Sequence, residues 1–165
     1  MSQLAENIVR RLVFGKPVRS ILVVGTTNTN ASALMEFLLK AEGEGKEMKF
    51  SSAGLSASDG SPMDARASSF LMAAGIDASG FRSRKLTDAM AGNFELMLCT
   101  SMAVKGFLLF LYPEATIYTL SEYALIGSDV SGMEGMPEDE YRQAAEELRE
   151  MAKRIIARAT KNTTF

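Results

Sequence analysis

Short runs of consecutive apolar residues alternate along the chain with stretches in which apolar residues recur every three or four positions. The short runs predict buried strands at 20–24, 48–53, 96–100 and 116–120. The periodic stretches predict helices at 4–12, 32–41, 64–74, 102–112 and 137–159. Strands that alternate with helices indicate a single α/β domain in three layers, in which helices cover both faces of a four-stranded parallel sheet.

The first predicted helix precedes this domain. It has a narrow apolar face and is followed by the helix-breaking sequence Gly15-Lys-Pro17. We therefore divide the chain into a helical extension, 1–17, and one larger α/β domain, 18–165. The apolar face packs on its own domain or, as the alternative, mediates homodimerisation with Arg10 and Arg11 at its rim. Its apolar residues are Leu4, Ile8, Val9 and Leu12.

Composition excludes several classes of function. Of the 165 residues, 47% are apolar, which suits one domain with a sizeable core. The net charge of −2 argues against a nucleic-acid partner. No apolar stretch has the length of a membrane span, and no secretory signal is recognisable, so we expect a cytoplasmic protein without a membrane partner.

The rarity of cysteine and histidine limits the chemistry further. The chain has no histidine and one cysteine, Cys99, so Ser-His-Asp and Cys-His arrangements are excluded. A transition-metal site is not expected either, and we expect no cofactor. We interpret Cys99, at the end of a predicted strand, as a small buried hydrophobic residue.

The most informative segment is the polar loop between the first predicted strand and the helix that follows it. Its backbone N–H groups and the helix N-terminus would point at one spot, which suits an anion. The loop has no Cys, Lys, Arg or His, however, and it also lacks the lysine of a nucleotide-binding P-loop. We favour a polar turn whose Thr and Asn side chains bond their own backbone, with weak binding of phosphate or another anion as the alternative. The loop consists of Gly25, Thr26, Thr27, Asn28, Thr29, Asn30, Ala31 and Ser32.

An ordered set of short motifs extends over most of the chain, from about Arg19 to the last helix. The motifs are Ser51-Ser-Ala-Gly54, Gly60-Ser-Pro-Met-Asp64, Arg66-Ala67, Gly75-Ile-Asp77, Ser83-Arg84, Leu86-Thr87 and Leu120-Ser-Glu-Tyr-Ala124. This set resembles the low-molecular-weight protein tyrosine phosphatase family in its bacterial arm. That arm includes tyrosine and arginine phosphatases, and arsenate reductases share the fold.

The resemblance also implies which positions would carry the family's chemistry. The family signature is a Cys-x5-Arg-Ser loop, which puts the nucleophilic Cys at Gly25 and the phosphate-clamping Arg at Ala31. A later Asp-Ile-x-Asp-Pro segment carries the general acid as its second Asp. Here it reads Asp129-Val-Ser-Gly132-Met133, so the acid position is Gly132 and the Pro position is Met133.

All three catalytic groups of the family are therefore missing. Gly25 cannot form a covalent phosphoryl-enzyme, Ala31 has no guanidinium to hold phosphate, and Gly132 cannot donate a proton. The resemblance thus implies a catalytically inactive homologue, a pseudophosphatase, that acts by protein interaction or regulation. A weak reader of an anionic ligand and a residual phosphomonoester hydrolase with a non-standard site are the alternatives.

The segment that replaces the acid loop supports two further interpretations. We expect Asp129 to orient the loop by hydrogen bonds to backbone, and we interpret Asp129 and Glu134 as solvated acidic residues in preference to a metal site. Met133 and Met136 lie beside the former pocket in this reading. If exposed, they would form an adaptable surface for a protein partner or a second copy of the chain.

Overall fold

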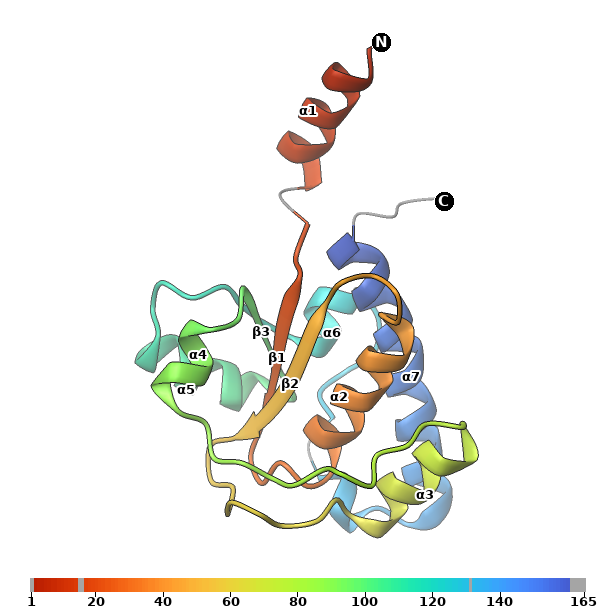
Figure 1. The fold of residues 1–165 in the computed structure, drawn as a ribbon. Coiled ribbons are helices and arrows are strands. Elements are labelled where there is room, and N and C mark those ends of the chain that lie inside the picture. Colours follow the sequence, from red (N-terminus) through yellow and green to blue (C-terminus); the bar gives the residue numbers. More distant parts are fainter. Residues whose placement is uncertain (1, 15–16, 131, 161–165) are drawn as a thin grey trace.

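The computed structural model describes residues 2–14, 17–130 and 132–160. Figure 1 shows one central sheet with helices on both of its sides. The elements are α1 (Gln3–Phe14), β1 (Ser20–Gly25), α2 (Ala31–Glu42), β2 (Lys49–Gly54), α3 (Ala65–Ala73), α4 (Asp88–Gly92), β3 (Leu96–Cys99), α5 (Met102–Leu111), β4 (Ile117–Thr119), α6 (Leu120–Ala124), the 3-10 helix η1 (Met133–Gly135) and α7 (Glu138–Thr160).

The sheet has four parallel strands in the order β2-β1-β3-β4. Strand β1 is central, and Val23 lies opposite Ser52 on one side and Leu98 on the other. Side chains alternate across the strand, so Ile21 and Val23 join the larger core while Leu22 and Val24 join the smaller one. The predicted three-layer α/β fold with a four-stranded parallel sheet is confirmed.

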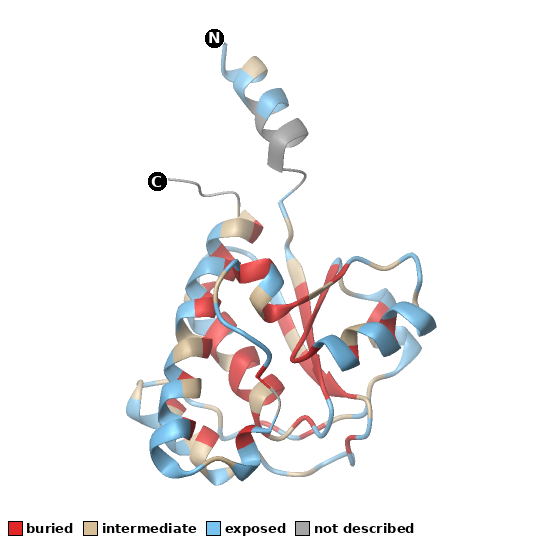
Figure 2. Ribbon diagram, turned by 180° about the vertical axis from the view of Figure 1, so that it is seen from behind, coloured by how far each residue is buried: buried red, intermediate tan, exposed pale blue. Residues whose placement is uncertain are grey.

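The two cores explain which helices cover which face. The larger core is formed by residues of α2, α3, α6 and α7, and the smaller one by residues of α4 and α5. Figure 2 shows the buried positions concentrated along the sheet and on the inner sides of the helices. The long apolar side of α7, which includes Leu148, Met151 and Ile155, is fully buried.

Three short elements, α4, α6 and η1, were not predicted from the sequence. Helices α4 and α6 have only five residues each, which is too short for a helical period to be recognised. Leu120, predicted as the end of a strand, is instead the first residue of α6. A capping box causes this change, because the Thr119 hydroxyl accepts from the Glu122 N–H and the Glu122 carboxylate accepts from the Thr119 N–H.

Helix α1 projects from the end of the sheet at which β1 begins (Figure 1). Leu4, Ile8 and Val9 are exposed, at 70%, 49% and 46% respectively. The interpretation in which this apolar face packs on its own domain is therefore wrong for the described side chains, and those of Arg10, Arg11 and Leu12 lie outside them. Within the described ranges no helix is both long and apolar enough to cross a membrane.

Candidate functional site

The polar loop lies at the carboxyl end of the sheet, between β1 and α2. Gly25 ends β1 beside Gly54 of β2. The N–H of Ser56 donates to the carbonyl of Thr26 over 2.9 Å, so the loop also follows the chain beyond β2. A Cβ on Gly54 would overlap the Thr26 carbonyl oxygen and lie 3.0 Å from the Asn28 nitrogen. A glycine at position 54 is thus what lets the loop approach the neighbouring strand this closely.

Asn28 determines the shape of the loop. Its backbone is in the left-handed region, with φ of 60°, a conformation that Asn tolerates better than most residues. Its buried Nδ2 donates to the hydroxyls of Ser32 (3.1 Å) and Ser52 (2.9 Å), and its Oδ1 accepts from the Arg84 N–H (3.0 Å). The expectation that loop side chains bond their own backbone is wrong here, because the partners of Asn28 lie on α2, β2 and the segment before α4.

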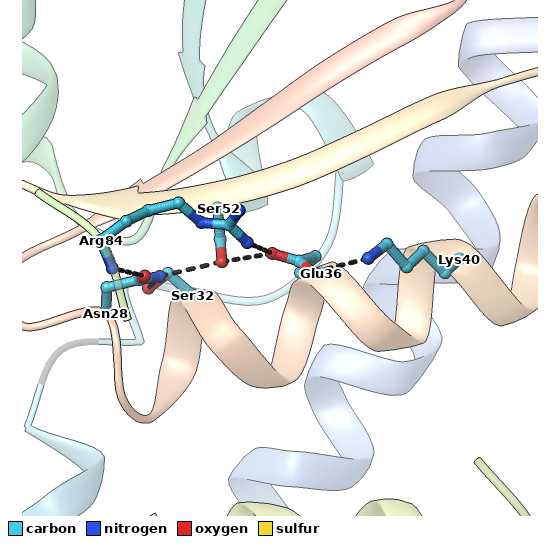
Figure 3. A network of polar contacts seen from close by, with 6 residues as sticks. All are labelled: Asn28, Ser32, Glu36, Lys40, Ser52 and Arg84. Atoms are coloured by element: carbon cyan, nitrogen blue, oxygen red, sulfur yellow. Dashed lines mark hydrogen bonds and ion pairs between the residues drawn. The ribbon is translucent and has the colours of Figure 1, made fainter. Parts of the chain in front are cut away.

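The row of contacts continues from Ser52 to the buried carboxylate of Glu36 (Figure 3). Glu36 is 1% exposed. It accepts from the Ser52 hydroxyl (2.7 Å), the Lys40 ammonium (2.7 Å) and the Arg84 guanidinium (3.1 Å). The two cations compensate the buried charge, which would otherwise be strongly unfavourable. Sequence reasoning missed Glu36, although a Glu on the apolar side of a predicted helix is a signal that could have found it.

Asn30 attaches the loop to α7. It precedes the first residue of α2, is 4% exposed, and its Oδ1 accepts from the Tyr141 hydroxyl over 2.8 Å. Burial raises the pKa of Tyr141, so the hydroxyl remains a donor at all physiological pH values. The Asn30 Nδ2 has no hydrogen-bond partner in the described part of the chain.

Two hydrogen bonds to backbone groups near the start of α5 hold residues 129 and 130 in place. The Oδ2 of Asp129 accepts from the N–H of Met102 at 3.1 Å, which confirms that Asp129 orients this segment through a backbone hydrogen bond. The N–H of Val130 donates to the carbonyl of Thr100 at 3.0 Å. Asp129 and Glu134 are both exposed, as expected for solvated acidic residues.

Arg66 of α3 fastens the residues that follow. Its guanidinium lies over the Tyr141 ring and donates to the carbonyls of Met133 (3.2 Å), Glu134 (2.9 Å) and Met136 (2.6 Å). These bonds hold the backbone of residues 133–136 against α3. Met133 is fully buried in the larger core, and Met136 is half-buried against it. The alternative in which both methionines form an exposed surface for a partner is therefore wrong for Met133.

A small pocket of about 160 Å³ lies above the loop. The positions that resemble the nucleophile, the phosphate clamp and the general acid all line it, so the structure brings Gly25, Ala31 and Gly132 together. Thr29, Asp129 and Met133 do not line it. The complete lining is Gly25, Thr26, Thr27, Asn28, Asn30, Ala31, Ser32, Thr100, Val130, Gly132 and Glu134.

The side chains that line this pocket are mostly polar, and one of them, Glu134, is acidic. They offer hydroxyls, carboxamides and the carboxylate of Glu134, and none of the lining residues is basic. Cys99 does not line the pocket. It is fully buried, and burial raises the pKa of its thiol to about 12, so it stays protonated and unreactive near neutral pH. The described residues contain no group of three acidic or cysteine side chains that could hold a metal ion.

Comparison with known proteins identifies the family to which the chain is similar. Residues 20–164 match the family described as low molecular weight phosphotyrosine protein phosphatase. No curated protein sequence matches the chain.

Solved structures of this family are similar over most of their length. A low-molecular-weight protein tyrosine phosphatase from T. tengcongensis shares 31% identity and a TM-score of 0.78, over 84% of this chain and 97% of that chain. The YwlE arginine phosphatase from Geobacillus stearothermophilus shares 26% identity and a TM-score of 0.80, over 87% and 94%. A low-molecular-weight protein tyrosine phosphatase from Bacillus subtilis shares 27% identity and a TM-score of 0.76, over 87% and 98%.

Proposed function

The chain belongs to the low molecular weight phosphotyrosine protein phosphatase family, and we propose that it is a catalytically inactive member that acts by protein interaction or regulation. One observation carries the proposal. Three positions that line one pocket correspond to the family's nucleophile, phosphate clamp and general acid, and they are occupied by Gly25, Ala31 and Gly132. None of the three residues has a side-chain group that can attack phosphorus, bind a dianion or donate a proton.

The size of the expected loss follows from what each group contributes. General acid catalysis accounts for a factor of about 10²–10⁴ in rate, and a charged donor at the developing negative charge for about 10²–10³. Loss of the nucleophile removes the covalent route altogether, and such losses are not additive. The Thr26 and Thr27 hydroxyls that remain in the pocket are weak nucleophiles as neutral alcohols, and the carboxylate of Glu134 is the only ionisable side chain among the lining residues that could serve them as a base.

Glu134 also acts against phosphate binding. A carboxylate in a pocket without a basic side chain repels a phosphate dianion. The N-terminus of α2 and the unpartnered Nδ2 of Asn30 act in the opposite direction, because both offer donors at the same pocket. Weak binding of an anionic ligand is therefore the second candidate function. The pocket offers hydrogen-bond donors for such a ligand, but none of its lining residues carries a positive charge.

Phosphorus NMR of the full chain with phosphotyrosine and phosphoarginine, followed over time, tests the proposal. We expect no growth of the inorganic phosphate signal above a sample without protein. Phosphate release that disappears when Asn30 and Ser32 are both changed to Ala would overturn it. Broadening of the substrate signals without hydrolysis would favour the anion reader over a purely structural role for the loop.

A further inference from the structure

Two exposed apolar surfaces lie outside the pocket, and neither has a partner in the described part of the chain. The first is the face of α1 that contains Leu4, Ile8 and Val9. The second is the outer face of α5. Its large apolar side chains are all more than one third exposed, and they are Met102 (55%), Phe107 (53%), Leu109 (39%), Phe110 (83%) and Leu111 (44%). In Figure 2 the outer side of α5 is accordingly coloured as exposed.

We propose that α1 of one copy of this protein docks on the exposed face of α5 of a second copy, so that the protein is a homodimer. This interface does not depend on whether the phosphatase-like pocket is active. An isolated helix of 12 residues such as α1 is marginally stable in water. Its stability must come from burial of its apolar face, and α5 offers the largest set of exposed apolar side chains described in the domain.

The connection between α1 and the domain favours a second copy over the chain's own α5. The Val18 N–H donates to the Ala159 carbonyl at 2.9 Å, and the Arg19 N–H donates to Glu95 Oε1 at 2.9 Å. Residues 18 and 19 are thus fixed to the domain, and three residues separate them from the end of α1 at Phe14. The four residue steps from Phe14 to Val18 span at most about 14 Å, and Figure 1 shows α1 leading away from the sheet.

The N-terminal segment and a groove at the end of α5 have opposite net charges. The segment 3–16 contains three basic residues and one acidic residue, and is net positive. A groove at the end of α5 is lined by Asp88, Glu95 and Glu114, together with Phe94 and Tyr112, and none of its lining residues is basic. Because β4 is parallel to β3, α5 runs back to the end of the sheet where β1 begins. The acidic groove and the base of α1 are therefore at the same end of the molecule.

Gly106 adds an independent argument. It lies one turn from both Met102 and Phe110 on the exposed face of α5, and a Cβ at this position would meet no atom within 4 Å. Gly inside a helix is less stable than Ala, and the domain itself does not require it here. A notch between Met102 and Phe110 does allow the close approach of another helix, because interaxial distance depends on the side chains at the contact.

In a dimer with a two-fold axis, the apolar faces of α1 and α5 are buried in both copies. Every copy carries one α1 and one α5 face, so reciprocal docking forms the same contact twice and closes the dimer. Two helix-on-helix contacts are needed, because specific interfaces bury more than about 1,000 Å².

Sedimentation equilibrium of the full chain and of three single variants tests the assembly. We expect the wild type to have twice the 17.9 kDa mass of the chain, and both Ile8→Glu and Phe110→Glu to be monomeric at the same concentration. Met72→Glu is the matched control, because Met72 is an isolated exposed methionine on α3 (76%), and it should remain dimeric. A wild type that is monomeric at its highest soluble concentration, or dimers that persist in both α1 and α5 variants, would overturn the proposal.

Disulfide trapping distinguishes docking between copies from docking within one chain. Cys99 is buried, so introduced cysteines react selectively. A mixture of Ile8→Cys with Phe107→Cys should form a covalent dimer of the two variants, whereas Ile8→Cys with Met72→Cys should not. An intrachain disulfide in the Ile8→Cys/Phe107→Cys double variant, without any covalent dimer in the mixture, would contradict the proposal. Monomers that bind anionic phosphatidylglycerol vesicles through α1 would contradict it as well.

Discussion

The Nδ2 of Asn28 lies 2.9 Å from the Oγ of Ser52, and this contact joins the polar loop to the neighbouring strand. Ser52 in turn donates to the buried carboxylate of Glu36 at 2.7 Å. These bonds hold the shape of the loop, while no cysteine or basic residue lines the pocket above it. The following predictions separate these two aspects of the site.

Replacement of Ser52 by Ala tests the frame. The change removes one partner from Asn28 and one from Glu36, both of which are buried. An unsatisfied buried polar group costs about 1–3 kcal/mol, so we expect the free energy of unfolding in urea to fall by about that amount. Ser56→Ala, at an exposed serine of the same region, should be close to neutral. Equal stability of the two variants would show that the Ser52 contacts do not stabilise the fold.

Gly54→Ala tests the close approach of the loop to β2. The new Cβ would overlap the Thr26 carbonyl oxygen, which must move together with the loop. We expect a loss of about 1–3 kcal/mol in the free energy of unfolding, typical of overpacking. Gly80→Ala is the control, because a Cβ at Gly80 meets nothing within 4 Å. A Gly54→Ala protein as stable as this control would mean that the loop has room to shift at no cost.

Arg66→Lys tests whether Arg66 holds residues 133–136 in place. A Lys ammonium cannot reproduce the fork of donors that contacts the carbonyls of Met133, Glu134 and Met136. We expect faster amide hydrogen exchange at Gly135 and Met136, whose N–H groups donate within this short turn. Arg142→Lys, at an exposed arginine of α7, should leave the exchange unchanged. Equal rates of amide hydrogen exchange in the two variants would show that Arg66 does not stabilise this segment.

The Cys99 thiol predicts a dependence of stability on alkaline pH. Burial raises its pKa from 9.0 to about 12. Above pH 9 the unfolded chain therefore loses this proton while the folded chain keeps it, so the free energy of unfolding decreases as pH rises. Buried tyrosines act in the same direction, so the comparison is with Cys99→Ala, whose stability should fall less between pH 8 and pH 10.5. Parallel pH profiles of the two proteins would contradict the assignment.

The fold was predictable from the sequence because buried strands and amphipathic helices have distinct hydrophobic periods. The position of the loop was predictable as well, since Gly25–Ser32 lies between a strand and a helix. The bond between Asn28 and Ser52 was not, because its partners are far apart in sequence and any loop Asn could equally bond its own backbone. The burial of Met133 was not predictable either, because it depends on the hydrogen bond that Arg66, from a distant helix, donates to the Met133 carbonyl.

The most direct test of the central claim compares the wild type with the variant Gly25→Cys/Ala31→Arg/Gly132→Asp. A Cβ at Gly25 would lie 3.1 Å from the Ser32 Oγ and 3.4 Å from a Thr100 methyl group, so a thiol fits after a small adjustment. In one assay of phosphate release from phosphotyrosine and phosphoarginine, we predict turnover by the triple variant and none above background by the wild type. Phosphate release by the wild type at a rate comparable with that of the triple variant would contradict the account.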